Sequence, residues 1–158
     1  RLRRLNFANE SGLISFGQTY GWNIVFPEAP RRVWVGLKPY GVIRSHVDTI
    51  TKIASRFPNP CLAGFSDGAT MAQYCAAYNP IFSFYVIHSG LVPKFGATSL
   101  VMNQKLFLVQ GSNDRYRMIR NAHFKLREIY GRKNQVFYTY IHGLGHNWYR
   151  PGNVEWFQ

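Results

Sequence analysis

Three residues that lie far apart in the sequence have the types and the order that a nucleophilic site requires. Ser66 lies between two glycines in the stretch G-F-S-D-G, Asp114 follows later, and His146 comes last. A serine hydroxyl becomes a nucleophile when a base takes its proton, and a histidine base needs an acid to orient its ring. Together the three residues could attack an acyl carbonyl, with Ser66 as the nucleophile.

The segments around Ser66 favour an exposed hydroxyl. The apolar run CLAGF before it predicts a strand, and residues 67–78 after it predict a helix. Gly64 and Gly68 lie where a sharp strand-to-helix turn crowds the backbone. The helix would direct its positive end, and the backbone amide of Asp67, at a developing negative charge. The alternative is a serine in an ordinary loop, because the G-x-S-x-G pattern alone is weak.

The acid and the base would each follow a later strand. Asp114 comes after the apolar run KLFLVQG and a Gly-Ser-Asn turn, and its alternative role is to cap the next helix. His146 lies in a Gly-rich turn after the run QVFYTYIHG, and His142 at the end of that run is the alternative base. We expect the other histidines to be structural: His46, His88 and His123.

Strands alternate with helices along most of the chain. The predicted strands are residues 22–26, 61–65, 81–90, 105–111 and 135–143. The predicted helices are residues 6–20, 44–57, 67–78, 116–131 and 152–158, and Leu13, Phe16 and Gly17 should pack inward from the first of them. This alternation predicts an α/β fold, a three-layer α/β/α sandwich with a mostly parallel sheet and its site at the carboxyl ends of the strands.

The order Ser66, Asp114, His146 is that of the α/β-hydrolases. The chain resembles the esterase branch of that superfamily, which includes polyhydroxybutyrate depolymerase-like, feruloyl esterase-like and dienelactone hydrolase-like proteins. Four stretches carry the resemblance: NIVFPEAPRRVW, AGFSDGATMAQYCAAYNPIFSFYVIHSG, LFLVQGSNDRY and HGLGHNWYR. The resemblance implies a serine esterase in which Ser66 attacks and His146 transfers the proton. Asp114 would orient His146, and the Asp67 amide would stabilise the oxyanion.

The resemblance covers residues 1–158 as a single domain. This domain would be partial and would correspond to the C-terminal two-thirds of an α/β-hydrolase domain. In the family, an earlier strand and a loop of H-G-G-G or H-G-x-G type supply a second oxyanion donor, and this sequence lacks both. Losing one donor costs about 3 kcal/mol of transition-state stabilisation. We therefore expect the sheet edge beside residues 22–26 to be completed by a partner chain or a further segment, or to be covered by the N-terminal residues.

The chain is strongly basic, with 19 Lys and Arg against 7 Asp and Glu and a formal net charge of +12. Such a charge is typical of proteins that bind nucleic acid or an acidic protein, and a solubilising surface is the alternative. The basic residues form small clusters at residues 1–4, 31–32, 115–120 and 132–133. A second hypothesis is therefore a catalytically silent α/β-hydrolase-like subunit that binds within a larger assembly, with or without nucleic acid.

Other classes of site are not indicated. No apolar run approaches the roughly 20 residues that span a bilayer, and no secretion signal is visible, so we expect a soluble protein of undetermined compartment. The sequence has no C-x-x-C or H-E-x-x-H motif, and we predict no metal and no cofactor. Cys61 and Cys75 should be buried free thiols, with a disulfide as the open alternative.

The expected substrate is a small-molecule or polymer ester, and the sequence does not identify its acyl group. Aromatic residues near the predicted strand ends would suit an apolar or aromatic acyl group, or they belong to the core: Phe65, Trp148 and Tyr149.

Overall fold

The computed structural model describes residues 7–157, which form two compact units. Residues 7–32 and 148–157 belong to the first unit, and Val33–Asn147 form the second. All three residues of the predicted triad lie in the second unit. The second unit therefore contains every side chain that the proposed chemistry needs.

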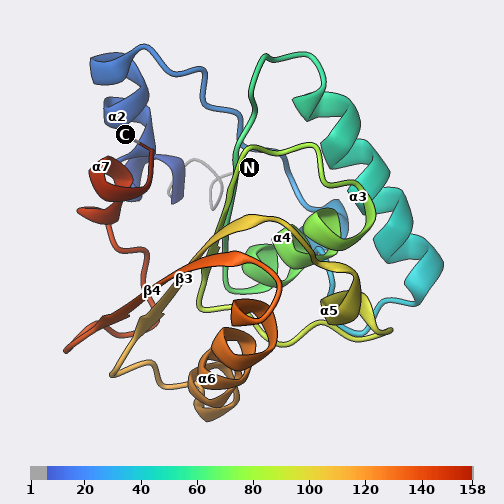
Figure 1. Ribbon diagram of the computed structural model, residues 1–158. Helices are drawn as coiled ribbons and strands as arrows, with labels where there is room; N and C mark the ends of the chain where they lie inside the picture. Colours follow the sequence, from blue (N-terminus) through green and yellow to red (C-terminus); the bar gives the residue numbers. More distant parts are fainter. Residues whose placement is uncertain (1–6, 158) are drawn as a thin grey trace. The chain divides into compact units, whose positions relative to one another are not determined.

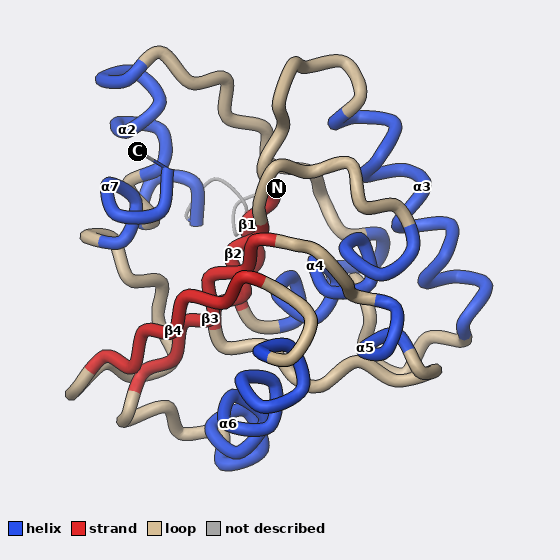
Figure 2. Tube along the Cα trace, in the orientation of Figure 1, coloured by secondary structure: helices blue, strands red, loops and turns tan. Residues whose placement is uncertain are grey.

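The second unit is built on a parallel sheet of four strands among the described residues, in the order β1-β2-β3-β4 (Figures 1 and 2). The strands are Leu62–Phe65 (β1), Tyr85–His88 (β2), Lys105–Gly111 (β3) and Gln135–Ile141 (β4). Phe65 pairs with His88, and His88 pairs with Val109. This register brings the carboxyl ends of the strands to one edge of the sheet.

One helix of this unit precedes β1, and the other three lie between successive strands (Figure 1). They are Tyr40–Ala54 (α3), Asp67–Tyr78 (α4), Ala97–Leu100 (α5) and Arg117–Gly131 (α6). One core joins their apolar sides to alternate strand positions, and it includes Val47, Ile50, Met71, Tyr74, Tyr85, Ile87, Leu106, Leu108, Leu126 and Tyr130. The hydroxyl of Tyr130 donates to Oε1 of Gln73 (2.9 Å), which links α6 to α4 inside that core.

Helix α4 is the most deeply buried of these helices, and it begins directly after Ser66. Residues 69–76 are all buried, and small side chains such as Ala69 and Ala76 let the helix lie close to its neighbours. Strand β2 is buried along its whole length, as a central strand of a parallel sheet should be. Ser66 is therefore anchored at the junction of two buried elements.

The first unit contains two helices, Leu13–Tyr20 (α2) and Gly152–Phe157 (α7), with a short 3-10 turn at Pro30–Arg32. Leu13, Phe16 and Gly17 are buried, as predicted. The ring of Phe16 lies 5.7 Å from that of Phe157, measured between centroids. This aromatic contact joins α2 to α7.

The strand predicted at residues 22–26 is wrong, because residues 22–29 have no regular secondary structure. The segment packs through its side chains instead. Ile24 contacts Gly17, and the Trp22 ring lies 6.0 Å from the Phe16 ring. An apolar run predicts burial, but a strand also needs a neighbour for its backbone hydrogen bonds. Because residues 22–26 form no strand, they offer no sheet edge for the backbone pairing that was expected there.

The α/β class with a parallel sheet is confirmed, and apart from the strand at residues 22–26 the errors concern where elements begin and end. The helix predicted at residues 6–20 is interrupted, because Gly12 adopts a left-handed conformation (φ 73°) between helical residues 7–10 and α2. Residue 6, where that helix was expected to begin, lies outside the described residues, as does the basic cluster at residues 1–4. Helix α3 begins at Tyr40, right after Pro39, so the prediction placed its start too late.

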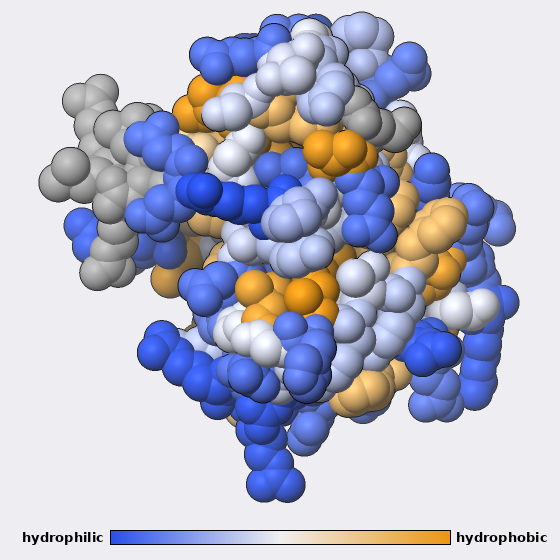
Figure 3. Space-filling model, turned by 90° about the vertical axis from the view of Figure 1, so that its left-hand side faces the viewer, coloured by the Kyte–Doolittle hydropathy of each residue, from blue (hydrophilic) through white to orange (hydrophobic). Residues whose placement is uncertain are grey.

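One face of the surface is largely hydrophilic (Figure 3), and the two thiols are at least partly buried. In the view of Figure 3, hydrophilic residues cover most of the face, and hydrophobic residues form small separate groups. Within residues 7–157 no helix has both the length and the apolar character needed to cross a bilayer. Cys61 and Cys75 are free thiols; Cys75 is buried and Cys61 only partly so, and burial raises the pKa of both to about 12.

Candidate active site

Ser66 occupies a sharp turn between β1 and α4. Its backbone angles are φ 56° and ψ −119°, which a residue with a side chain rarely adopts. Hydrogen bonds hold it there: its N–H donates to the His88 carbonyl (2.9 Å), and its own carbonyl accepts from the amides of Ala69 (3.0 Å) and Thr70 (3.2 Å). Strain at one serine, fixed by both neighbouring elements, is typical of a nucleophile turn.

The two glycines beside Ser66 have different reasons to be there. A Cβ at Gly64 would overlap the backbone of Gly68 and Ala69, so only glycine lets the helix come this close to the strand. A Cβ at Gly68 would meet no atom within 4 Å. The prediction that crowding requires both glycines is therefore correct for Gly64 and wrong for Gly68.

The structure brings Ser66, Asp114 and His146 together. Nε2 of His146 lies 3.0 Å from Oγ of Ser66, and its Nδ1 lies 2.7 Å from Oδ2 of Asp114. The ring is 14% exposed and the carboxylate is fully buried. In this geometry Nδ1–H donates to the acid, and Nε2 accepts the serine hydroxyl proton. His142, the alternative base, is exposed on the same loop, and the contacts are made by His146 instead.

Two aromatic rings flank His146. The Phe65 ring lies 4.8 Å from it, tilted by 38°, and the Tyr116 ring meets it nearly at a right angle, with 4.7 Å between centroids. Phe65 therefore supports the proposed base and is not simply core. Trp148 and Tyr149 pack against Trp156 in the first unit.

The acid is held in place by several donors. Besides His146, Nε2 of Gln110 donates to Oδ2 of Asp114 (3.1 Å), and the Tyr116 N–H donates to Oδ1 (2.9 Å). Burial alone would raise the pKa of Asp114, but the hydrogen bonds from His146, Tyr116 and Gln110 outweigh it and lower the pKa below its usual range. Asp114 therefore stays ionised, as the orienting acid of a triad should.

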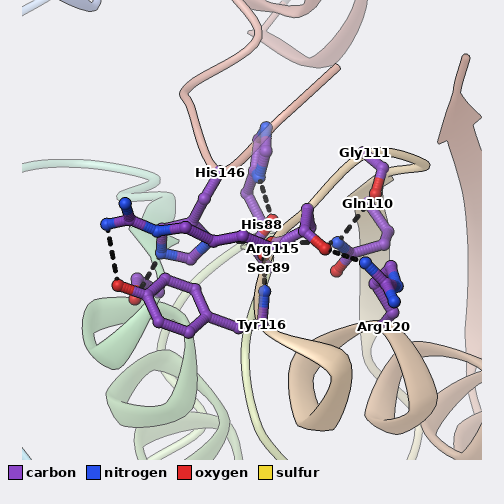
Figure 4. A network of polar contacts seen from close by, with 10 residues as sticks. His88, Ser89, Gln110, Gly111, Arg115, Tyr116, Arg120 and His146 are labelled. Atoms are coloured by element: carbon purple, nitrogen blue, oxygen red, sulfur yellow. Dashed lines mark hydrogen bonds and ion pairs between the residues drawn. The ribbon is translucent and has the colours of Figure 1, made fainter. Parts of the chain in front are cut away.

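Gln110 and Arg120 were not foreseen from the sequence. Gln110 is fully buried at the end of β3, and Arg120 donates from its guanidinium to the Asp114 carbonyl. In Figure 4 both lie on the opposite side of the view from His146 and Tyr116. A polar residue that ends an otherwise apolar strand run was the signal that could have identified Gln110.

The loop that carries His146 is attached to the end of β3. A Cβ at Gly111 would overlap the Leu144 carbonyl, so glycine is required for the close approach of the two backbones. The Asn113 N–H donates to the same carbonyl (2.9 Å), and the Gly143 N–H donates to Oγ of Ser112 (2.8 Å). The loop that carries Asp114 and the loop that carries His146 therefore hold each other in place.

A buried histidine, His88, lies next to the aromatic ring that supports His146. His88 ends β2, its ring is 5.2 Å from that of Phe65, and its Nδ1 is 3.1 Å from Oγ of Ser89. Burial lowers the pKa of His88 to about 3, with a smaller contribution from His146, so His88 is neutral. A structural role for His88 stays a prediction, and the residue lies against Phe65, which packs on His146.

Asp67 has a role that the sequence did not suggest. Its carboxylate accepts the backbone N–H groups of Trp34 (2.6 Å from Oδ2), Val35 (3.2 Å from Oδ2) and Gly36 (3.1 Å from Oδ1). Its backbone amide is the first of α4, and the first amides of a helix have no acceptor within the helix. The Asp67 side chain thus secures the loop at residues 34–36, and an oxyanion role for its amide stays a prediction.

The described residues contain no group of three or more His, Cys, Asp or Glu side chains that could hold a metal ion. The polar side chains at the strand ends instead form a hydrogen-bonded series from serine through histidine to acid. This arrangement can move a proton between Ser66 and His146 without any further group.

Solved structures match this chain, whereas comparisons of its sequence find no match. No protein-family model matches the chain, and no curated protein sequence matches it either. A crystal structure of a SOBER1 variant from Arabidopsis thaliana matches with a TM-score of 0.73 at 18% identity, over 94% of this chain and 88% of that chain.

Two further structures match over less of their length. The carboxylesterase of Bacillus cereus has a TM-score of 0.59 at 17% identity, over 84% of this chain and 68% of that chain. Acyl-protein thioesterase 2 of Zea mays has a TM-score of 0.58 at 18% identity, over 78% of this chain and 68% of that chain. With the sheet order and the serine turn, these similarities show that the chain has the α/β-hydrolase fold.

Proposed function

We propose that this chain is a serine hydrolase that cleaves an ester or a related acyl bond through an acyl-enzyme intermediate. One observation carries the proposal: the His146 ring lies within hydrogen-bond distance of both the Ser66 hydroxyl (3.0 Å) and the Asp114 carboxylate (2.7 Å). The structural neighbours include a carboxylesterase and an acyl-protein thioesterase, and both names are consistent with this class of reaction.

The proposed reaction has two halves. Ser66 Oγ attacks the acyl carbon while His146 Nε2 takes the hydroxyl proton, and the carbonyl oxygen becomes an oxyanion beside the Asp67 amide. The tetrahedral intermediate then releases the alcohol or thiol, which receives that proton from His146. Water repeats the sequence on the acyl-enzyme: His146 accepts its proton, the acid product leaves, and the proton returns to Ser66.

The chain is proposed to correspond to the C-terminal two-thirds of an α/β-hydrolase domain. The first-turn amides of α4 support one half of an oxyanion site, and the family draws its second donor from a segment before this region. In this proposal a further segment or a partner chain supplies that donor. Its contribution would be about 3 kcal/mol of transition-state stabilisation.

Hydrolysis of short-chain 4-nitrophenyl esters tests the proposed reaction. Ser66→Ala and His146→Ala should reduce turnover to the background rate, and Asp114→Asn should reduce kcat by about 10⁴-fold because it misorients the base. His142→Gln, on the same loop, is the matched control and should keep wild-type activity. A folded wild-type protein without turnover would reject the proposal and favour the silent binding subunit.

An anionic macromolecular partner for the basic surface stays a prediction. The described clusters at residues 31–32, 115–120 and 132–133 lie in three separate segments of the chain, the first in the 3-10 turn Pro30–Arg32 and the others on or beside α6. Binding through such residues should weaken steeply as salt rises, because neutralised phosphates release counterions. Elution from heparin at low salt would instead indicate a solubilising surface.

A further inference from the structure

A guanidinium group is fixed beside the proposed base. Nη2 of Arg115 donates to the Tyr116 hydroxyl (2.9 Å), and Cζ of Arg115 lies 4.9 Å from the centroid of the Tyr116 ring. That ring is the one that packs on His146, with 4.7 Å between centroids. Figure 4 shows the Arg115 and Tyr116 side chains joined by this contact next to the His146 ring. The positive charge is therefore held close to the site of proton transfer.

The charge of Arg115 is exposed and uncompensated. Among residues 7–157 no carboxylate forms an ion pair with its guanidinium. Asp114, its neighbour in sequence, directs its carboxylate to His146, Gln110 and the Tyr116 N–H. A guanidinium without a carboxylate partner among the described residues suits a carboxylate or a phosphate, which it can bind through its remaining N–H groups.

The position of the guanidinium relative to the triad indicates which part of a substrate it would meet. His146 must return its proton to the leaving group, so the leaving atom has to lie within hydrogen-bond reach of Nε2. The acyl oxygen instead lies beside the Asp67 amide at the start of α4. Because the Tyr116 ring contacts both His146 and the Arg115 guanidinium, we expect the guanidinium to face the leaving group.

We propose that Arg115 makes this site select esters or thioesters whose leaving alcohol or thiol carries a carboxylate or phosphate group. The inference rests on the proposed hydrolase function and adds its substrate class. Arg115 binds the anionic group and takes no part in making or breaking the acyl bond. Tyr116 is a positioning residue, because its hydroxyl and ring fix the guanidinium.

Two acetyl esters that differ only in the charge of the leaving group test the inference: anionic 4-acetoxybenzoate and neutral 4-acetoxybenzamide. The ratio of their kcat/KM values should fall about fivefold in Arg115→Gln, as expected for one exposed charge pair, and mainly through KM. Arg117→Gln removes the same charge from the first residue of α6 and should keep the wild-type ratio. High salt should lower the wild-type ratio, because exposed charges are screened.

Further variants and substrates separate the outcomes. Tyr116→Phe keeps the ring on His146 but releases Arg115, so the ratio should fall here too. 4-Acetoxyphenyl phosphate repeats the measurement with a phosphate on the leaving group. Whichever anionic ester, carboxylate or phosphate, shows the larger Arg115-dependent preference identifies the anion that Arg115 binds.

An unchanged ratio in Arg115→Gln, or an equal fall in Arg117→Gln, overturns the inference. Hydrolysis of the neutral ester would still uphold the proposed function. An Arg115-dependent preference for 4-nitrophenyl hemisuccinate over 4-nitrophenyl butyrate would overturn the leaving-group assignment, and no turnover of any ester would overturn both proposals.

Discussion

At the residue scale, the site depends on side chains that orient the acid as well as on the triad. Gln110 is fully buried, and its Nε2 donates to Asp114 and to the Gly111 carbonyl, both at 3.1 Å. The first of these hydrogen bonds holds the carboxylate oxygen that His146 also contacts. The triad order could be read from the sequence because each member follows a strand. Gln110 was missed: its place near the end of an apolar run was a weak signal, because a glutamine at a strand end has many structural roles.

Replacing Gln110 with methionine keeps the volume of the side chain and removes its donor. We expect kcat to fall about tenfold with little change in KM, because one hydrogen bond to a charged group is lost. Steady-state kinetics on a short 4-nitrophenyl ester give both constants. Gln104→Met, at a half-buried glutamine whose Nε2 donates to the Met102 carbonyl, is the control. Equal kcat in the Gln110 variant and the control would reject a positioning role.

At the element scale, the turns after the strands set the geometry. The β1–α4 turn was predictable, since glycines, an apolar run and a small-residue helix surround one serine. The attachment of the His146 loop to β3 was not, because no local pattern reports which backbones come into contact. Residues 22–26 illustrate the same limit: apolar character indicated their burial, whereas strand formation depends on a neighbour that the sequence does not specify.

The contact between Gly111 and the Leu144 carbonyl gives a direct prediction for this scale. Gly111→Ala should push the His146 loop away and reduce kcat at least about a hundredfold, because a shift of about 1 Å at the base has that effect. Gly131→Ala is the matched control, since a Cβ there meets no atom within 4 Å. Measuring kcat and the free energy of unfolding for both variants distinguishes a misplaced His146 loop from a loss of stability. Wild-type kcat in Gly111→Ala would contradict the predicted overlap.

At the scale of the whole molecule, two buried histidines link stability to pH. Burial is the main cause that lowers the pKa of His88 to about 3 and of His123 to about 4. In the unfolded chain a histidine titrates near about 6.5. Below that pH the unfolded state binds protons that the folded state does not. The free energy of unfolding should therefore fall as pH decreases from about 6.5 to about 4, by up to about 1.4 kcal/mol per pH unit for each histidine.

Urea unfolding at several pH values between 7 and 5 measures this slope. His123 stacks on Tyr138 with 4.3 Å between ring centroids, and its Nε2 is buried without a hydrogen-bond partner. Phenylalanine at position 123 should keep the stacking, raise stability and reduce the slope by about half. His142→Gln changes an exposed ring and should keep the wild-type slope. The lowered pKa of Asp114 affects stability only at lower pH, below about 4. An unchanged slope in His123→Phe would show that His123 does not contribute.

The nucleophilic role of Ser66 is the central claim, and covalent labelling tests it most directly. A fluorophosphonate probe reacts with a serine only when a base and an oxyanion site activate it. The intact mass of the wild-type protein should rise by one adduct, and peptide mapping should locate the adduct on Ser66. Ser66→Ala should show no rise. A folded wild-type protein that stays unlabelled, or that is labelled at another residue, would contradict the claim.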